Sequence, residues 1–199
     1  MLTVNREGHV LDPRIQLAIC PRLEHGTMLY VRGIIVHQTD SPTAQATLNA
    51  YRHQPNGAHF LIDRDGSVIQ TASIRQRAWH TGPLKARCIA ELRCAPREAS
   101  RIGKMSPRQI DRHEMQKSVP DRYPSNFESL GIELVGLAYP LGEKNSKRKV
   151  FENVHTLQNM SLRWLVQELS LTCGIPVSEV FRHPLVSEKN LTEASTAQW

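Results

Sequence analysis

Alternating apolar and polar stretches along the chain predict several short strands that alternate with helices. An apolar run over 33–36 leads directly into His37 and a polar turn, and a second run covers 130–135. Such short runs rich in Val, Ile and Leu are typical of buried strands. Two further runs, 58–63 and 68–70, flank an Asp-Gly pair, which predicts a β-hairpin. Because a hairpin is antiparallel, we expect a mixed sheet.

Helical spacing is predicted for two segments. Ser41 as N-cap and Pro42 at the first helical position begin a helix that we expect to reach about His53. A longer helix is predicted over 153–173, with Gly174 as its C-terminal cap. Its predicted apolar stripe consists of Val154, Leu157, Trp164, Leu165 and Leu169. The fold class is therefore α/β (α+β), a central mixed β-sheet flanked by helices.

The length of 199 residues fits a single domain, 1–199. Residues 1–29 are predicted to be an irregular lead-in segment, and 84–125 an insertion of short helices. No apolar run approaches the length of a membrane span. The first residues also lack the apolar core of a secretory signal. We therefore expect a protein that is cytoplasmic as synthesised.

Positive charge is concentrated in one part of the chain. The net charge is +6, yet residues 75–112 hold ten Lys or Arg against three acids. Such a segment indicates an anionic partner or a solvated surface. Nucleic acid is the less favoured partner, because no aromatic interleaving or nucleic-acid motif accompanies the charge. The four cysteines show no CxxC spacing, so a cysteine zinc site is not expected. Cys88 and Cys94 are near enough in sequence to pair, but we expect free thiols.

Glu133 is a carboxylate inside an apolar strand. An unpaired buried carboxylate is costly, so Glu133 must be paired, bound to metal or reactive. Burial would raise its pKa toward the range of a general base. The alternative is a Glu on the solvent face of a half-buried strand.

Two histidines and a late carboxylate form a candidate zinc set. His37 ends a predicted strand, His183 follows an apolar turn, and Glu193 lies ten residues further on. Two His and one carboxylate leave a fourth zinc position for water. Lys189 could stabilise an oxyanion. Four other histidines are interpreted as surface or helix residues: His25, His53, His113 and His155.

Five segments, in order, resemble the zinc-dependent N-acetylmuramoyl-L-alanine amidases, which share the fold of peptidoglycan recognition proteins. They are VHQTDSP, AHFLIDRDGSVIQ, RAWHTG, NFESLGIELVG and the stretch from His183 to Glu193. RAWHTG and GIELVG are most similar to the branch of cytoplasmic amidases that recycle cell-wall fragments. The resemblance covers about residues 30–195.

The resemblance implies particular roles for matching residues. His37 and His183 would be the first two Zn²⁺ ligands and Glu133 the catalytic acid/base, with Lys189 as a weaker match to a catalytic lysine. The third ligand of the family is Asp or Cys, whereas the matching position here is Glu193, one methylene longer than Asp. Trp79 and His80 match a loop that lines the substrate groove.

The implied activity is hydrolysis of the amide between N-acetylmuramic acid and L-alanine in peptidoglycan or its fragments. Two biological roles fit. One is a cytoplasmic recycling enzyme. The other is an antibacterial effector delivered to a target-cell periplasm by a secretion system, with an immunity protein as partner. The competing function is a non-catalytic recognition module that binds peptidoglycan.

Overall fold

The computed structural model describes residues 1–199 as one mixed sheet with surrounding helices. The strands are β1 (Ile15–Leu17), β2 (Gly33–Gln38), β3 (Phe60–Ile62), β4 (Val68–Gln70), β5 (Ser129–Leu134), β6 (Ala138–Tyr139), β7 (Val150–Phe151) and β8 (Val180–Arg182). The α-helices are α1 (Ala44–Tyr51), α2 (Arg87–Ala90), α3 (Pro96–Ile102), α4 (Pro107–Glu114), α5 (Thr156–Cys173) and α6 (His183–Val186). Short 3₁₀ turns cover Pro21–Leu23, Ser146–Arg148 and Val177–Glu179.

Six strands form the main sheet, in the order β1-β4-β3-β5-β2-β8. β2 pairs in parallel with β5 and β8, and β3 also pairs in parallel with β5. β3 and β4 are antiparallel, which confirms the Asp-Gly hairpin. Gly66 in that turn has a φ of 86°, a conformation that side chains disfavour. The predicted mixed sheet is therefore confirmed.

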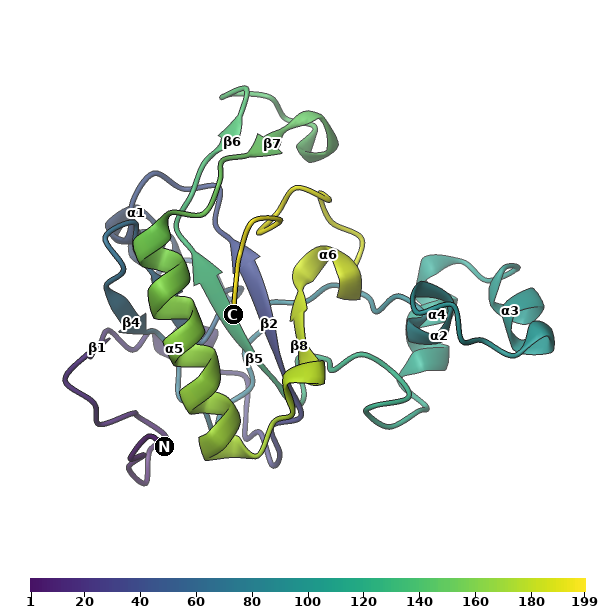
Figure 1. The fold of residues 1–199 in the computed structure, drawn as a ribbon, viewed down its shortest axis with the longest axis horizontal. Coiled ribbons are helices and arrows are strands. Elements are labelled where there is room, and N and C mark those ends of the chain that lie inside the picture. The colour runs from purple at the N-terminus through teal and green to yellow at the C-terminus, as the bar shows by residue number, and fades with distance from the viewer.

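Helix α5 covers one face of this sheet (Figure 1). It ends as predicted at Gly174, which adopts a left-handed conformation with φ of 69°. Its buried side chains are Gln158, Leu162, Leu165, Val166 and Leu169. The predicted stripe was wrong at Leu157, which is 52% exposed, because the helix presents the neighbouring Gln158 to the sheet instead. Gln158 donates hydrogen bonds to the backbone carbonyls of Ile62 and Val135.

Helix α1 begins later than predicted. Its N-cap is Thr43, whose hydroxyl accepts a hydrogen bond from the backbone N–H of Ala46. The helix starts at Ala44 and ends at Tyr51, so Ser41 and Pro42 precede it. Thr43 has the extended backbone of an N-cap and offers the same kind of side-chain oxygen as Ser41.

The first 29 residues are more ordered than predicted. They contribute β1 at the edge of the sheet, paired in parallel with β4. Four of their side chains belong to the main core: Leu2, Val10, Ile15 and Met28. The backbone of Val10 is also attached to the sheet, because its N–H donates a hydrogen bond to the side-chain oxygen of Gln70 in β4. The apolar residues of this segment are too widely spaced to form a periodic pattern in the sequence.

The predicted insertion forms an arm of three short helices, α2, α3 and α4, that projects from the side of the sheet (Figure 1). Arg87 joins the arm to the body through two hydrogen bonds to the carboxylate of Glu179, at 2.8 and 2.9 Å. Both side chains are buried. The guanidinium also lies over the rings of Tyr123 and Phe181.

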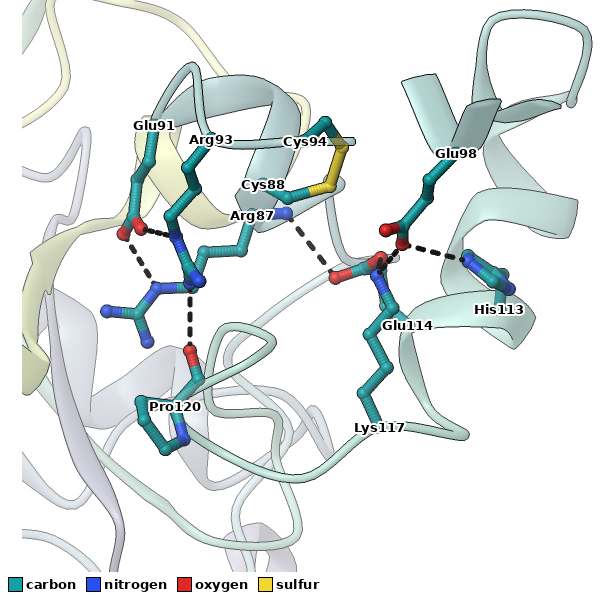
Figure 2. Close-up of a disulfide and its surroundings, with 10 residues drawn as sticks. All are labelled: Arg87, Cys88, Glu91, Arg93, Cys94, Glu98, His113, Glu114, Lys117 and Pro120. Carbon is teal, nitrogen blue, oxygen red and sulfur yellow. Dashed lines mark hydrogen bonds and ion pairs between the residues drawn. A yellow bond between two sulfur atoms is a disulfide. The ribbon is translucent and has the colours of Figure 1, made fainter. Parts of the chain in front are cut away.

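A disulfide joins Cys88 and Cys94 inside this arm (Figure 2). The expectation of free thiols was wrong for this pair, because the turn after α2 brings the two residues together. Cys20 and Cys173 are free. Figure 2 also shows Lys117 between two carboxylates, Glu98 at 2.7 Å and Glu114 at 2.8 Å. None of the helices is long and apolar enough to cross a membrane.

Candidate active site

Three side chains converge at the carboxyl end of the parallel strands. His37 Nδ1 lies 2.8 Å from His183 Nδ1, and His183 Nδ1 lies 2.9 Å from Glu193 Oε1. His37 Nδ1 and Glu193 Oε1 are 3.6 Å apart. All three residues are buried. The three predicted ligands, which lie far apart in the sequence, therefore form one group with the geometry of a possible metal site.

The sheet topology explains this convergence. His37 is in β2, next to its C-terminal residue, and His183 directly follows the neighbouring parallel strand β8. Carboxyl ends of parallel strands lie at the same edge of a sheet, where ligands of α/β folds commonly bind. Glu193 reaches this edge from the C-terminal segment. That segment is attached through Gln38, whose side-chain oxygen accepts a hydrogen bond from Ala194 N–H.

The charges in this group are set by burial and by mutual contacts. Burial raises the pKa of Glu193, but the hydrogen bond from His183 and the proximity of His37, whose Nδ1 atom lies 3.6 Å away, outweigh it and lower the pKa to about 2. Burial and repulsion by His183 lower the pKa of His37 to about 4. Near neutral pH the group therefore contains an ionised carboxylate and a neutral His37 imidazole.

Glu133 faces the same cavity from β5. Burial, followed by repulsion from Glu193, raises its pKa to about 8, while Lys189 acts in the opposite direction. Its Oε2 atom is buried and has no hydrogen-bond partner. A carboxyl group with a pKa near neutrality and a free oxygen can both accept and donate a proton.

The cavity around these residues has a volume of about 580 Å³. His37, Glu133, His183, Lys189 and Glu193 all line it, together with Trp79 and His80. Trp79 is 48% exposed and stacks on His25, with 3.6 Å between ring centroids. The exposed indole is suited to contact with a ligand, whereas Lys189 supplies a positive charge at the rim.

His80 makes a contact that the sequence did not predict. Its Nδ1 atom lies 3.0 Å from His37 Nε2, on the opposite side of the His37 ring from His183. Burial, followed by repulsion from His37 and His59, lowers the pKa of His80 well below its usual value. His59, also unpredicted, is fully buried and accepts a hydrogen bond from Gly131 N–H. No sequence periodicity links these loop and strand histidines.

The group of three fits a zinc ion by its chemistry. Imidazole nitrogen and carboxylate oxygen are both ligands that zinc prefers. The two Nδ1 atoms face one another at 2.8 Å beside an ionised carboxylate, so lone pairs would repel unless a proton or a cation lies among them. The other four histidines interpreted above as surface or helix residues lie outside this group.

Comparison of the chain with known proteins gives a consistent result. The family model described as N-acetylmuramoyl-L-alanine amidase matches residues 27–196. A crystal structure of AmpD superimposes with a TM-score of 0.55 at 16% identity, covering 94% of this chain and 89% of the other. The catalytic domain of XlyA gives a TM-score of 0.53 at 17% identity, covering 88% and 87%.

A third similar structure is AmpDh3 from Pseudomonas aeruginosa, solved in complex with an anhydromuramic pentapeptide. It gives a TM-score of 0.52 at 18% identity and covers 94% of this chain but 58% of AmpDh3. None of the curated proteins compared matches the chain. The structural similarities support the fold, and the family model extends over most of the sequence. The chain therefore belongs to the N-acetylmuramoyl-L-alanine amidase family, whose members are peptidoglycan-cleaving hydrolases.

Proposed function

We propose that this protein is a zinc-dependent amidase that hydrolyses the amide between the lactyl group of N-acetylmuramic acid and L-alanine. The observation that carries the proposal is the position of Glu133 beside the His37, His183 and Glu193 group, in one cavity. A ligand set and a proton carrier together are what metal-assisted amide hydrolysis requires. Zinc bound there would polarise the scissile carbonyl and lower the pKa of a water molecule.

Glu133 would move the protons of the reaction. Its carboxylate takes a proton from the attacking water as the water oxygen bonds to the carbonyl carbon. The same carboxyl then delivers that proton to the alanine nitrogen as the C–N bond breaks, so the peptide leaves as a neutral amine. In the zinc-free site the pKa of Glu133 is about 8, so both protonation states are accessible near neutral pH, and the positive charge of zinc would favour the carboxylate that accepts the proton.

Two other residues would bind the substrate. Lys189, which is exposed at the rim of the cavity, would stabilise negative charge that develops on the carbonyl oxygen. Trp79, stacked on His25, would contact the sugar or the peptide with its exposed ring. The anhydromuramic pentapeptide bound by AmpDh3 supports a muropeptide as the substrate class.

The experiment is mass spectrometry of the products from zinc-loaded protein with two substrates, intact sacculi and soluble anhydro-muropeptides. Free stem peptides from either substrate establish the amidase. Release from sacculi favours the antibacterial effector role, and release only from soluble fragments favours recycling. No release from either, with zinc bound, would leave a non-catalytic recognition module as the better proposal.

The Cys88–Cys94 disulfide supports the effector role over cytoplasmic recycling. Structural disulfides persist in oxidising compartments such as the periplasm and are rare in the cytosol. The effector role therefore predicts that the protein cleaves intact sacculi while this disulfide is oxidised. Activity confined to soluble fragments would argue against it.

A further inference from the structure

The His37 ring is held from two sides. Its Nδ1 atom faces His183 and Glu193, and its Nε2 atom lies 3.0 Å from His80 Nδ1. The two rings of His37 and His80 meet at 86°, edge to face. His80 thus lies behind a proposed ligand, away from the point where the three donor atoms converge.

We propose that His80 is a positioning residue that fixes His37 in the tautomer able to bind metal through Nδ1. This inference rests on the proposed zinc site. An imidazole binds a metal through a nitrogen without a proton, so the other ring nitrogen must carry it. A partner that accepts a hydrogen bond from His37 Nε2–H would select that tautomer and hold the ring in one orientation.

The hydrogen bonds around His80 make it an acceptor toward His37. His80 Nε2 lies 3.3 Å from the backbone carbonyl of Ser129, which can only accept. The Ser129 hydroxyl also lies 3.2 Å from His80 Nε2, but it donates its proton to Ser125 O at 2.6 Å, so toward His80 it can only accept. The proton of His80 therefore belongs on Nε2, and its Nδ1 lone pair accepts the hydrogen bond from His37 Nε2–H.

The surrounding chain is shaped to hold His80 in this place. Asn126 Oδ1 accepts hydrogen bonds from the backbone N–H groups of His80 and Thr81, and Asn126 Nδ2 donates to Thr81 O. Gly131 in β5 leaves the space that the ring fills. A Cβ atom at residue 131 would lie 2.8 Å from His80 Cγ and 2.9 Å from its Nδ1.

His183 has no such support. Its Nε2 atom is buried and has no hydrogen-bond partner, so no hydrogen bond to Nε2 selects the tautomer of His183. In the metal-free protein its Nδ1 donates to the Glu193 carboxylate, which can only accept. Of the two histidines, only His37 is therefore prepared for metal in advance. Loss of His80 should weaken metal binding even though His80 does not touch the metal.

The experiment measures the zinc dissociation constant by competition with a chelator for the full-length protein and three variants. His80→Leu removes the acceptor. His80→Asn restores an acceptor oxygen near the position of Nδ1. His59→Leu is the matched control, because His59 is another buried histidine beside Gly131 that has no hydrogen bond to a proposed ligand.

We expect His80→Leu to weaken zinc binding about 10- to 100-fold, the range typical of residues that support a metal ligand. His80→Asn should recover most of the affinity, and His59→Leu should bind zinc like wild type. Equal affinity of wild type and His80→Leu, or equal weakening by His59→Leu, would overturn the inference.

A second measurement uses only the wild type, so it does not depend on the folding of any variant. Nitrogen NMR of the imidazole rings in the zinc-free wild type should show His37 protonated at Nε2 and unprotonated at Nδ1. A proton on Nδ1 would overturn the inference. Neither readout depends on amide hydrolysis. A protein that binds zinc but releases no stem peptide would contradict the proposed function. The zinc affinity and the NMR result would still decide whether His80 positions His37.

Discussion

His37 and Glu133 occupy directly paired positions on the neighbouring parallel strands β2 and β5. Residues paired in register point to the same face of a sheet, so the backbone itself places a proposed ligand and the proposed proton carrier side by side. Rigid strands hold such groups more precisely than loops do. The separation of these two side chains is thereby fixed before substrate arrives.

Replacement of Glu133 tests the proton-transfer role. Glu133→Gln preserves the shape of the side chain but cannot accept a proton from water. We expect the rate of amide hydrolysis to fall by about 10²- to 10⁴-fold, the usual contribution of general acid–base catalysis. Zinc content, measured by metal analysis, should stay unchanged. An active variant with bound zinc would show that another group moves the proton.

The stability of the zinc-free protein should depend on pH through the same residue. Folding raises the pKa of Glu133 from 4.5 to about 8. The contribution of this residue to the free energy of unfolding is therefore fully present below pH 4.5 and is lost as the pH rises toward 8, because the folded protein must then bury an ionised carboxylate. The side chain of Glu133→Gln does not ionise, so the free energy of unfolding of this variant does not fall for this reason. We expect the variant to be more stable than wild type by about 2–4 kcal/mol at pH 8 and nearly equal at pH 4.5.

Denaturant unfolding of both zinc-free proteins at several pH values measures this difference. Glu193→Gln serves as the comparison, because the pKa of Glu193 is lowered to about 2. Loss of the ionised Glu193 carboxylate should destabilise the protein near neutral pH. A Glu133→Gln variant less stable than wild type at pH 8 would contradict the assignment of a buried, desolvated carboxyl.

Glu193 stands where the resemblance implies an Asp or Cys, and its proposed role as a zinc ligand can be tested by changing the length of the side chain. Glu193→Ala should weaken zinc binding by more than about 100-fold, the upper end of the loss seen for supporting residues. Glu193→Asp keeps the charge but withdraws the carboxylate by one methylene, so we expect an intermediate affinity. Full zinc occupancy in Glu193→Ala at low zinc concentration would require another third ligand.

The arm should depend on its buried ion pair. Arg87→Ala leaves the Glu179 carboxylate buried without a partner, which typically costs about 3–5 kcal/mol. Glu179→Ala combined with Arg87→Ala should cost less than the sum of the two single changes, since neither charge is then left alone. Thermal or denaturant unfolding of the three variants measures the coupling. Additive effects would mean that the pair does not attach the arm.

Local patterns in the sequence were sufficient to predict β2, the hairpin, β5 and the end of α5. These elements depend on short apolar runs, an Asp-Gly turn and a terminal glycine, which act over a few residues. The convergence of His37, His183 and Glu193 was also expected, through the resemblance to a known family. The structure confirms that the three lie together.

Features that depend on long-range packing were not predictable in the same way. The contact between His80 and His37 joins a loop to a strand 43 residues away. The pairing of Cys88 with Cys94 depends on the turn after α2, and the choice of Thr43 over Ser41 as N-cap depends on where the chain leaves β2. In each case the sequence offered more than one suitable residue, and tertiary packing selected among them.

The decisive comparison is between wild type and Glu133→Gln, both loaded with zinc, on soluble anhydro-muropeptides. Mass spectrometry follows the products. We expect free stem peptide and peptide-free sugar from wild type, and neither from Glu133→Gln over the same time. If zinc-loaded wild type releases no stem peptide from these fragments or from intact sacculi, the proposed amidase activity is wrong.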